Sequence, residues 1–519
     1  MHCRLVLFVL TLGLVRPLLA QDSTAAKDSM AAQDTALVPR LAPLATLTLS
    51  DALAQARRHS PVYRQALNNA GPARWGVRNA YGNFLPSVQV ASDLGYTGSG
   101  QSTFGAFFNQ TSPFLRSTYS IGLQMQLDGK TLAGPGQQKA LERATSQDIE
   151  NAGVGLRFDV TDQYLTAEDA VAQTEVAREQ VRRNEEFLRL AQTRYRVGQA
   201  TLLDVRQAEA TRGTSQVTLL RAFQTENEAK LELFRRMGVV PPAPVEQIAL
   251  TDSFTVAEPR FKLDELITMA EGENPSLRAL RERSSAAGAS VRAAKSEYFP
   301  TLTAQAGWSG FAQQFTNENQ LLSEQLQTAQ GQAADCQFNN QVRTGLNLGG
   351  TTPDCFGTFG LDATGKSLNP ATAALVRSRN DVFPFGFAGQ PFQATVTLSL
   401  PIFSGFGREL RVSQARADEE DADEAARAQG LAVRASVHAR FLGLTTAYKT
   451  IGVQEVGRAA ARDQLRLAQD RYRVGLGTAL EVTDAQSAVE RSEADYVTAV
   501  YDYHRAFAAL EAAVGRPLR

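Results

Sequence analysis

The chain has 519 residues and a formal net charge of −1 at pH 7. This charge is too small to create a basic field, so nucleic acid is not an expected partner. The few histidines beyond the N-terminus, His59, His438 and His504, lack the spacing of metal ligands, and no nucleophile–base signature is present. We therefore expect no metal site, no cofactor and no enzyme activity. The length is enough for two or more domains.

The N-terminus has the features of a secretory signal peptide over residues 1–20. A basic residue, Arg4, precedes an apolar run from Leu5 to Val15, and the small Ala20 suits the cleavage position. An uncleaved membrane anchor is the alternative, although the run is short for a bilayer span. The next segment, residues 21–45, is rich in Ala, Asp and Ser without periodicity, so we predict a flexible leader.

The rest of the chain contains an internal sequence repeat. The segment "LRLAQTRYRVGQATLLDVRQA" from Leu188 and the segment "LRLAQDRYRVGLGTALEVTDA" from Leu465 share 14 of 21 residues at an offset of 277 positions. Earlier pairs, such as Pro61 with Pro275, have an offset of 214. We predict a tandem duplication. Its parts are a first repeat (residues 46–241), a linker (242–259), and a second repeat (260–516) with a long loop insertion at about 309–391.

Each repeat opens with helical sequence that a proline interrupts, Pro61 or Pro275. Two segments of alternating apolar residues follow in each repeat. The apolar positions that share one strand face are Val88, Val90, Ile121, Leu123, Met125 and Leu127 in the first repeat, and Leu302, Ala304, Trp308, Val396, Leu398 and Leu400 in the second. Alternation over about ten residues is typical of outer-membrane barrel strands. A half-buried hairpin of a soluble protein is the alternative interpretation.

Very long proline-free stretches come next, at residues 137–197 and 409–474. At 1.5 Å per residue they predict roughly 90–100 Å of helix. That length favours coiled-coil or helical-barrel packing. Each stretch leads into a return helix of about half its length, over residues 202–236 or 479–514.

The turn between each long helix and its return helix has clear stop and start signals. Gly198 and Gly475 suit the left-handed position just beyond a helix C-terminus. Capping-box spacing follows in both copies, Thr201 with Asp204 and Thr478 with Glu481. Each repeat is therefore predicted to contain one tight helical hairpin.

Four strands cannot close a membrane barrel, since closed barrels begin at about eight strands. An open sheet edge in lipid would leave backbone groups without hydrogen bonds. If these strands enter a membrane, several chains must share one barrel.

These residues resemble the TolC-like outer-membrane efflux proteins from Leu49 to Gly515. The resemblance is carried by the duplication, by the paired "RYRVG..T" turns and by "LPIFSGFGRE" after the last strand. It implies a mostly α fold with a β membrane portion. Tandem-duplicated long helical hairpins would form a periplasmic α-barrel, and four β-strands per chain would contribute to a shared 12-stranded trimeric β-barrel.

The resemblance also implies a function and partners. The chain would be the outer-membrane channel, or exit duct, of a tripartite efflux pump or type I secretion system. As a multi-pass β-barrel extending into the periplasm, it would pass small molecules or polypeptides to the exterior. Its partners would be two further copies of itself, a periplasmic adaptor protein, an inner-membrane efflux transporter or secretion ATPase, and outer-membrane lipid. A soluble periplasmic coiled-coil scaffold is the alternative.

The same resemblance points to site residues at the hairpins. It implies a periplasmic gate formed by Asp204, Glu481, Asp484 and Tyr472. It also implies adaptor-contacting tips formed by Val197, Gly198, Thr201, Val474, Gly475 and Thr478. The chain departs from the family pattern at Gly477, where the best-known member has an arginine, and at Leu203, which replaces a polar partner.

The acidic residues have a simpler alternative explanation. Capping alone accounts for Asp204 and Glu481, whereas Asp484 is not required by the cap. In a threefold assembly Glu481 and Asp484 would supply six carboxylates around one axis, which would favour cations.

Two further features lie in the insertion of the second repeat. Cys336 and Cys355 are 19 positions apart in a chain expected to be exported, so they form a possible disulfide; two free thiols are the alternative. The segment "GLDATGKS" (360–367) matches the P-loop pattern. No apolar strand precedes it and Pro370 follows it, so nucleotide binding is not expected.

Overall fold

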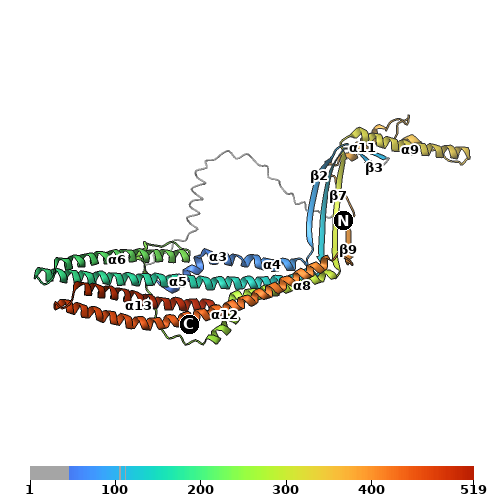
Figure 1. The fold of residues 1–519 in the computed structure, drawn as a ribbon. Helices are drawn as coiled ribbons and strands as arrows, with labels where there is room; N and C mark the ends of the chain where they lie inside the picture. The colour runs from blue at the N-terminus through green and yellow to red at the C-terminus, as the bar shows by residue number, and fades with distance from the viewer. Residues whose placement is uncertain (1–45, 105–106, 112, 519) are drawn as a thin grey trace, which may run out of the picture. The chain divides into compact units, whose positions relative to one another are not determined.

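The structure, a computed structural model, describes residues 46–104, 107–111 and 113–518 (Figure 1). The expected signal peptide (1–20) and leader (21–45) lie outside these residues. The chain forms two compact units. The first contains the described residues up to 73, residues 142–284 and those from 422 onward, and the second contains residues 74–141 and 285–421. Within the described chain, no helix has both the length and the apolar character of a membrane span.

Helices dominate the first unit. The four longest are α5 (Gly129–Arg196), α6 (Leu202–Met237), α12 (Gly407–Arg473) and α13 (Ala479–Val514). The shorter helices are α2 (Leu49–His59), α3 (Pro61–Asn68), α4 (Ala70–Gly82), η1 (Val245–Gln247), α7 (Leu263–Glu273) and α8 (Pro275–Lys295). The two-residue strands β1 (Thr46–Leu47) and β6 (Ala249–Leu250) pair in parallel. Helices α4, α5, α8 and α12 also continue into the second unit.

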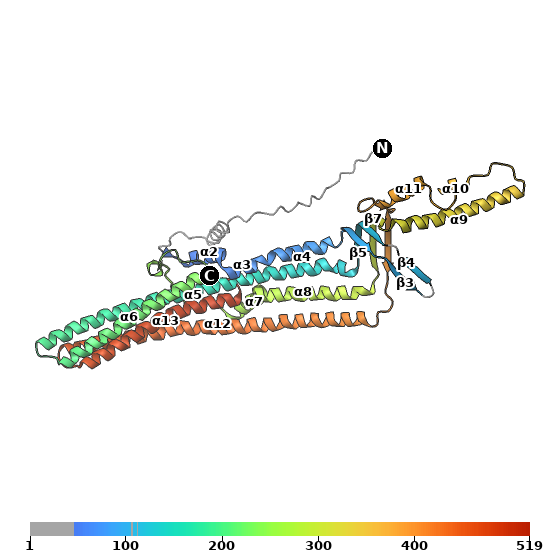
Figure 2. The ribbon, with the colours of Figure 1, turned by 90° about the horizontal axis from the view of Figure 1, so that it is seen from above.

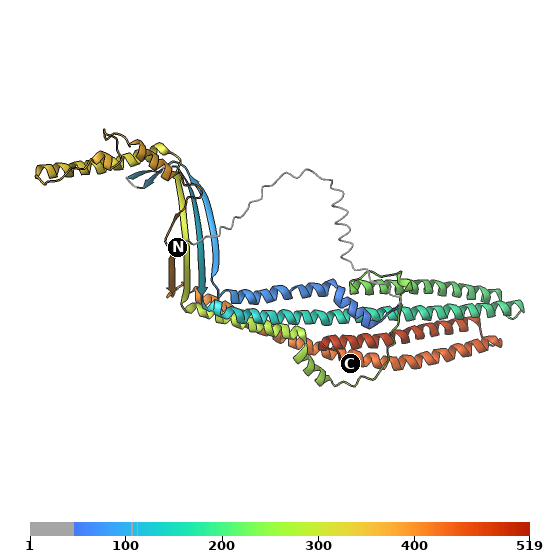
Figure 3. The same cartoon turned by 180° about the vertical axis from the view of Figure 1, so that it is seen from behind.

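The long helices form two antiparallel hairpins, α5 with α6 and α12 with α13. Figures 1 and 3 show them side by side in the order α6, α5, α13, α12. Direct bonds join α5 to α13: Gln173 donates to the Ala494 carbonyl at 3.0 Å, and Arg505 lies 3.4 Å from Asp169. The predicted long helices are confirmed. However, α5 begins eight residues before the predicted start and includes Pro135, since Asp128 caps its first turn by accepting from the Thr131 amide at 2.7 Å.

Each repeat has its own apolar core in the first unit, and several positions of the two cores are equivalent. Ala52 and Ala56 of α2 pack with Leu156, Val160, Leu233 and Met237. In the second core, Leu266 and Ala270 of α7 pack with Val433, Val437, Leu510 and Val514. The α2 and α7 positions differ by the 214-residue offset, and the others by the 277-residue offset. The predicted helix breaks are confirmed, since Pro61 begins α3 and Pro275 begins α8.

A sheet forms the centre of the second unit. Its long strands are β2 (Ser87–Thr97), β5 (Phe114–Leu127), β7 (Thr301–Phe315) and β9 (Gln393–Ser399). Strand β5 pairs with β2 and β7, and β7 pairs with β9 and with the short β8 (Ala388–Gly389), all antiparallel. A separate small hairpin, β3 (Gly100–Phe104) with β4 (Phe107–Thr111), was not anticipated from the sequence.

The register of this sheet sorts its residues by polarity. One face carries apolar rows, including Val90–Ile121–Trp308 and Met125–Ala304–Val396. The other face carries Gln89–Gly122–Gly307–Gln393 and Gln124–Gln305–Thr395. Several apolar side chains are exposed in the single chain, among them Val88, Val90, Leu94, Trp308, Val396 and Leu398.

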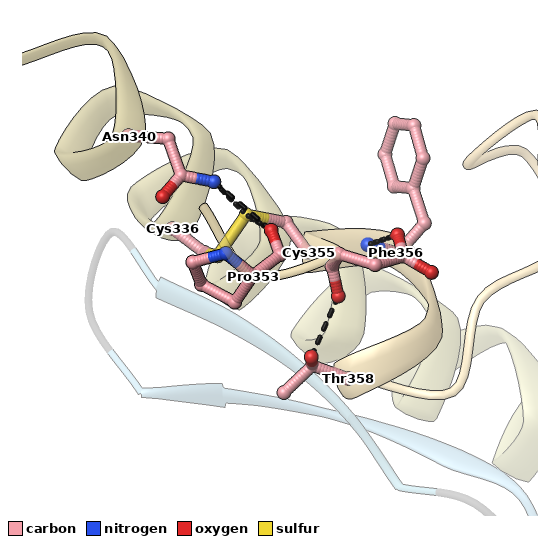
Figure 4. Close-up of a disulfide and its surroundings, with 7 residues drawn as sticks. Cys336, Asn340, Pro353, Cys355, Phe356 and Thr358 are labelled. Atoms are coloured by element: carbon pink, nitrogen blue, oxygen red, sulfur yellow. Dashed lines mark hydrogen bonds between the residues drawn. A yellow bond between two sulfur atoms is a disulfide. The ribbon is translucent and has the colours of Figure 1, made fainter. Parts of the chain in front are cut away.

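The insertion after β7 is helical, contrary to the loop that its Gln/Asn/Gly-rich composition suggested. It contains α9 (Glu318–Gly345), α10 (Cys355–Thr358) and α11 (Pro370–Asn380), seen together in Figure 2. Many of its residues are Gln, Ala, Leu and Glu, which are good helix formers. Cys336 on α9 and Cys355 at the start of α10 form a disulfide of 1.98 Å, with Asn340 and Pro353 beside it (Figure 4).

Candidate functional site at the tips of the two helical hairpins

The tip of the first hairpin is a complete stop and start signal. Gly198 follows the end of α5 with φ of +75°, a backbone conformation that glycine adopts without strain. Thr201 then caps α6 by accepting from the Asp204 amide at 3.2 Å, and the Asp204 carboxylate accepts from the Thr201 amide at 2.8 Å. The capping box predicted at this tip is therefore confirmed.

The tip of the second hairpin has only half of this arrangement. Gly475 has φ of +84°, and Thr478 accepts from the Glu481 amide at 3.2 Å. The Glu481 carboxylate lies instead 3.9 Å from the Arg471 guanidinium. The full capping box expected for Thr478 and Glu481 is thus wrong in its second half. The longer Glu481 side chain is directed toward Arg471, whereas the shorter Asp204 folds back onto its own N-cap.

The two tips are joined across the chain by Arg194, near the end of α5. Its guanidinium donates to the backbone carbonyl of Tyr472 on α12 and lies 4.5 Å from the centre of the Tyr472 ring. It also donates to the Gln199 carbonyl at 3.1 Å, so it binds its own turn as well. Sequence reasoning missed this contact of Arg194 with the other hairpin. The one available signal was the recurrence of the same arginine as Arg471 in the second copy.

Tyr472 lies inside an apolar cluster, which we call the tip cluster. Only 3% of Tyr472 is exposed, and its ring centre lies 5.4 Å from that of Phe187. Burial raises the pKa of Tyr472, and the negative charge of Asp204 raises it further. Among the described residues, its hydroxyl has no hydrogen-bond partner. The tip cluster comprises Phe187, Leu188, Ala191, Val205, Ala208, Leu465, Ala468, Tyr472, Ala479, Val482, Ala485 and Val489.

The four expected gate residues therefore have different environments within one chain. Tyr472 and Asp204 come from different hairpins and are brought together. Glu481 and Asp484 are exposed, one turn apart on α13. Gly477 lies close to the end of α12, because a Cβ there would be 3.0 Å from the Tyr472 amide nitrogen. Leu203, at the other departure from the family pattern, is exposed.

The expected docking residues lie at the outer ends of the hairpins. Val197, Gly198, Thr201, Val474, Gly475 and Thr478 are all exposed. Exposed apolar neighbours extend this surface: Leu203 beside the first tip, and Leu476 and Leu480 beside the second. Exposed apolar side chains gathered on one surface indicate a contact site.

A second group of ionisable residues lies buried farther along the first unit, and sequence reasoning missed it. Glu168 on α5 is 7% exposed, and one of its carboxylate oxygens has no hydrogen-bond partner in the part of the chain that the structure describes. Burial raises the pKa of Glu168 to about 7, and the nearby Asp252 carboxylate adds to the rise. Lys230 and Glu226 form a buried ion pair at 2.8 Å on α6. In the sequence these residues look like the other charged residues of a helix, so only tertiary packing reveals that they are buried.

The P-loop-like segment does not form a phosphate cradle. The carboxylate of Asp362 accepts from the amides of Thr364, Lys366 and Ser367 at 3.1–3.4 Å. The Ser367 hydroxyl donates to the same carboxylate at 2.9 Å, and these bonds lower the pKa of Asp362 to about 2. The loop's own side chain thus occupies the amides that a phosphate would need. Across the described residues, no cluster of three or more His, Cys, Asp or Glu side chains could hold a metal ion.

Comparisons with known proteins point to one family. The family model described as "Outer membrane efflux protein" matches residues 52–239 and 362–516. These two matches cover both repeats and more than half of the chain. The chain belongs to the outer membrane efflux protein family.

Individual relatives agree with this membership. The probable efflux pump outer membrane protein SepC of Pseudomonas putida is 30% identical over 210 residues, which is 37% of this chain and 42% of SepC. The chain therefore matches less than half the length of that relative. Outer membrane protein TolC of Escherichia coli is 22% identical over 456 residues, covering 86% of this chain and 78% of TolC. The solved outer membrane protein VceC of Vibrio cholerae has a TM-score of 0.65 at 17% identity, covering 91% of this chain and 97% of VceC.

The likeness to VceC shows that the chain has the fold of that outer membrane protein. Membership of the outer membrane efflux protein family favours the channel over the soluble coiled-coil scaffold that the sequence left as an alternative.

Proposed function

We propose that this chain is an exit duct in the outer membrane, extending into the periplasm, through which a tripartite efflux pump or type I secretion system releases its cargo. The observation that carries the proposal is the register of the β2–β5–β7–β9 sheet. One face presents exposed apolar rows, and the opposite face presents Gln, Gly and Thr. This is the pattern of a barrel wall with lipid outside and water inside.

The edges of the sheet support sharing of the barrel between copies. Among the described strands, β2 pairs only with β5, and β9 pairs only with β7. In lipid, each open edge would leave backbone N–H and C=O groups unsatisfied. Pairing β9 of one copy with β2 of the next removes both edges. Three copies with four long strands each would give the 12-stranded barrel that the family resemblance implies.

The hairpin tips are proposed as the gated periplasmic end. Arg194 joins the two hairpins of one chain through the carbonyl and the ring of Tyr472. Glu481 and Asp484 are exposed on α13, so in a threefold assembly they would form an acidic ring that favours cations. The exposed residues of both tips would receive a periplasmic adaptor, which connects the duct to an inner-membrane transporter or secretion ATPase. No cofactor or enzyme activity belongs to this proposal.

The first experiment is to measure the native mass and the location of the mature protein after detergent extraction of outer membranes. We expect a detergent-dependent trimer of about 160 kDa. This mass is three times that of the mature chain, which is the full 56.2 kDa less the signal peptide. A soluble monomer in the periplasmic fraction would overturn the channel and leave the scaffold.

Planar-bilayer recording then tests the acidic ring. The double variant Glu481→Gln/Asp484→Asn should lose cation selectivity and block by divalent cations, while Glu186→Gln, an exposed site on α5, serves as the control. Unchanged selectivity and block in the double variant would overturn the acidic ring.

A further inference from the structure

The contact between the two hairpins of one chain uses equivalent residues unequally. Tyr472 of the second repeat is 3% exposed, because it lies beneath Arg194 and against Phe187 of the first repeat. Its counterpart in the first repeat, 277 positions earlier, is Tyr195, which is 45% exposed. The surface around Tyr195 thus resembles the surface around Tyr472, but within the described residues of the single chain no arginine lies over its ring in the way that Arg194 lies over Tyr472.

The equivalent arginines of the two repeats, Arg194 and Arg471, also differ in their contacts. Arg194 and Arg471 occupy equivalent positions, and each donates to the carbonyl five residues ahead, Gln199 at 3.1 Å and Leu476 at 3.3 Å. Both guanidinium groups are therefore held at their own turns in the same way. Arg194 also covers the ring of Tyr472. The Arg471 side chain remains 60% exposed, and beyond its own turn its recorded ion pair among the described residues is with Glu481, at 3.9 Å.

Apolar neighbours repeat the pattern. Leu190 packs against the tip cluster, which contains the buried Ala479. The position equivalent to Leu190 in the second repeat is Leu467 on α12, and the position equivalent to Ala479 in the first repeat is Leu202 on α6. In the single chain, Leu467 is 58% exposed and Leu202 is 51% exposed. Each hairpin therefore has one side with an arginine that can cover a tyrosine and one side with a tyrosine that can be covered. Within the described part of a single chain, only the arginine side of the first hairpin and the tyrosine side of the second are in contact.

We propose that Arg471 of one copy lies over the ring of Tyr195 in a neighbouring copy, with Leu467 against Leu202, so that the contact within each chain is repeated between chains. The proposal rests on the oligomeric duct proposed above and assigns residues to its chain-to-chain contact. The partner is a second copy because Arg and Tyr are identical in both repeats, so the second copy offers the geometry already seen within the first.

The helix order makes this contact possible at both flanks. In the order α6, α5, α13, α12, the outer helices are α12, which carries Arg471 and Leu467, and α6, which begins at Leu202. Within the chain, the long helix of one repeat meets the return helix of the other, α5 with α13. The same rule applied between copies brings α12 to α6. Such a head-to-tail contact joins different surfaces, and it closes into a ring when the rotation permits.

Cysteine cross-linking in the full-length, detergent-extracted protein tests the assignment. The test variant is Tyr195→Cys/Arg471→Cys, treated with a short bismaleimide. The matched control is Arg194→Cys/Tyr472→Cys, the equivalent pair that already meets within one chain. The two cysteines within the described residues, Cys336 and Cys355, are already joined in a disulfide, so neither offers a free thiol. We expect covalent dimer and trimer from the test variant, neither of which appears with Tyr195→Cys or Arg471→Cys alone. The control should cross-link only within single chains.

The outcomes separate this proposal from the proposed function. If the protein is a membrane trimer and the control pair reacts but the test pair gives only monomer, the contact is overturned and the duct stands. If the protein is a soluble monomer, the duct itself fails. If the cysteine variants do not fold, a benzophenone amino acid at position 195 keeps an aromatic ring there. Its photoproducts should then map to residues 464–476 of another copy, whereas products only with an adaptor protein would overturn the assignment.

Discussion

Glu168 lies on α5 in the first unit, where packing rather than local sequence sets its ionisation. Desolvation raises the pKa of its carboxyl from 4.5 to about 7, and the charge of Asp252 acts in the same direction. Lys230 and the Tyr164 hydroxyl oppose the shift. Below pH 4.5 the carboxyl is protonated in both the folded and the unfolded chain. As pH rises toward 7 the unfolded chain releases this proton first, so Glu168 progressively destabilises the fold, and the full penalty persists above pH 7.

The variant Glu168→Gln should therefore be more stable than the parent at pH 8 and equally stable near pH 4.5. The difference at pH 8 should be about 3 kcal/mol, since the pKa rises from 4.5 to about 7 and each pKa unit corresponds to about 1.4 kcal/mol. Thermal unfolding followed by circular dichroism at both pH values measures it. The exposed Glu186→Gln variant on the same helix is the control. A stability gain that is the same at both pH values would contradict the assignment.

At the scale of elements, each return helix ends at a glycine that the opening helices pack against. Gly238 follows α6 with φ of +77°, and Gly515 follows α13 with φ of +93°; the two are separated by the repeat offset of 277. A Cβ at Gly238 would lie 2.6 Å from the His59 carbonyl oxygen, and one at Gly515 would lie 2.8 Å from the Pro275 Cδ. In each repeat, the helix break at the proline thus packs against the glycine that ends the return helix. We call this contact the joint.

Substituting Gly238 with alanine should be much more damaging than substituting Gly198. Both positions have left-handed backbone, φ of +77° and +75°, but no atom lies within 4 Å of a Cβ at Gly198. Each alanine costs about 1–2 kcal/mol for the backbone conformation, and overpacking adds about 1–3 kcal/mol at Gly238 alone. Thermal unfolding of the two variants measures the difference. Equal losses of stability would show that the joint at His59 is not tightly packed.

The elements themselves were largely readable from the sequence. Periodicity located the four long strands and the long helices, and glycine and threonine located both turns. The start of α5 was misplaced, because Pro135 was treated as a boundary. It is instead the seventh residue of the helix, where it gives up one backbone hydrogen bond. The helices of the insertion were missed because their face is held by packing among Ala329, Ala333 and Leu361, and no apolar period announces it.

At the scale of the whole molecule, the apolar face of the sheet is the proposed contact with lipid. Replacing Val90 with arginine places a charge on the proposed lipid face, at a cost of about 2–4 kcal/mol near the bilayer midplane. The neighbouring Gln89→Arg puts the same charge on the opposite face. We expect the Val90 variant to lose most of its outer-membrane trimer and the Gln89 variant to retain it. Fractionation followed by native electrophoresis compares them, and equal tolerance of both arginines would argue against a lipid-facing surface.

The sequence by itself determined the duplication, the type of each main element and the position of both hairpin turns, because these depend on local periodicity and on residues such as Gly198 and Thr201. It also carried the family resemblance. Only the tertiary structure decided that Arg194 covers Tyr472 while Arg471 and Tyr195 remain open, and that Glu168 is buried. Identical residues acquired different roles because burial and partners depend on which helices meet, and that information lies in packing between segments almost 300 positions apart.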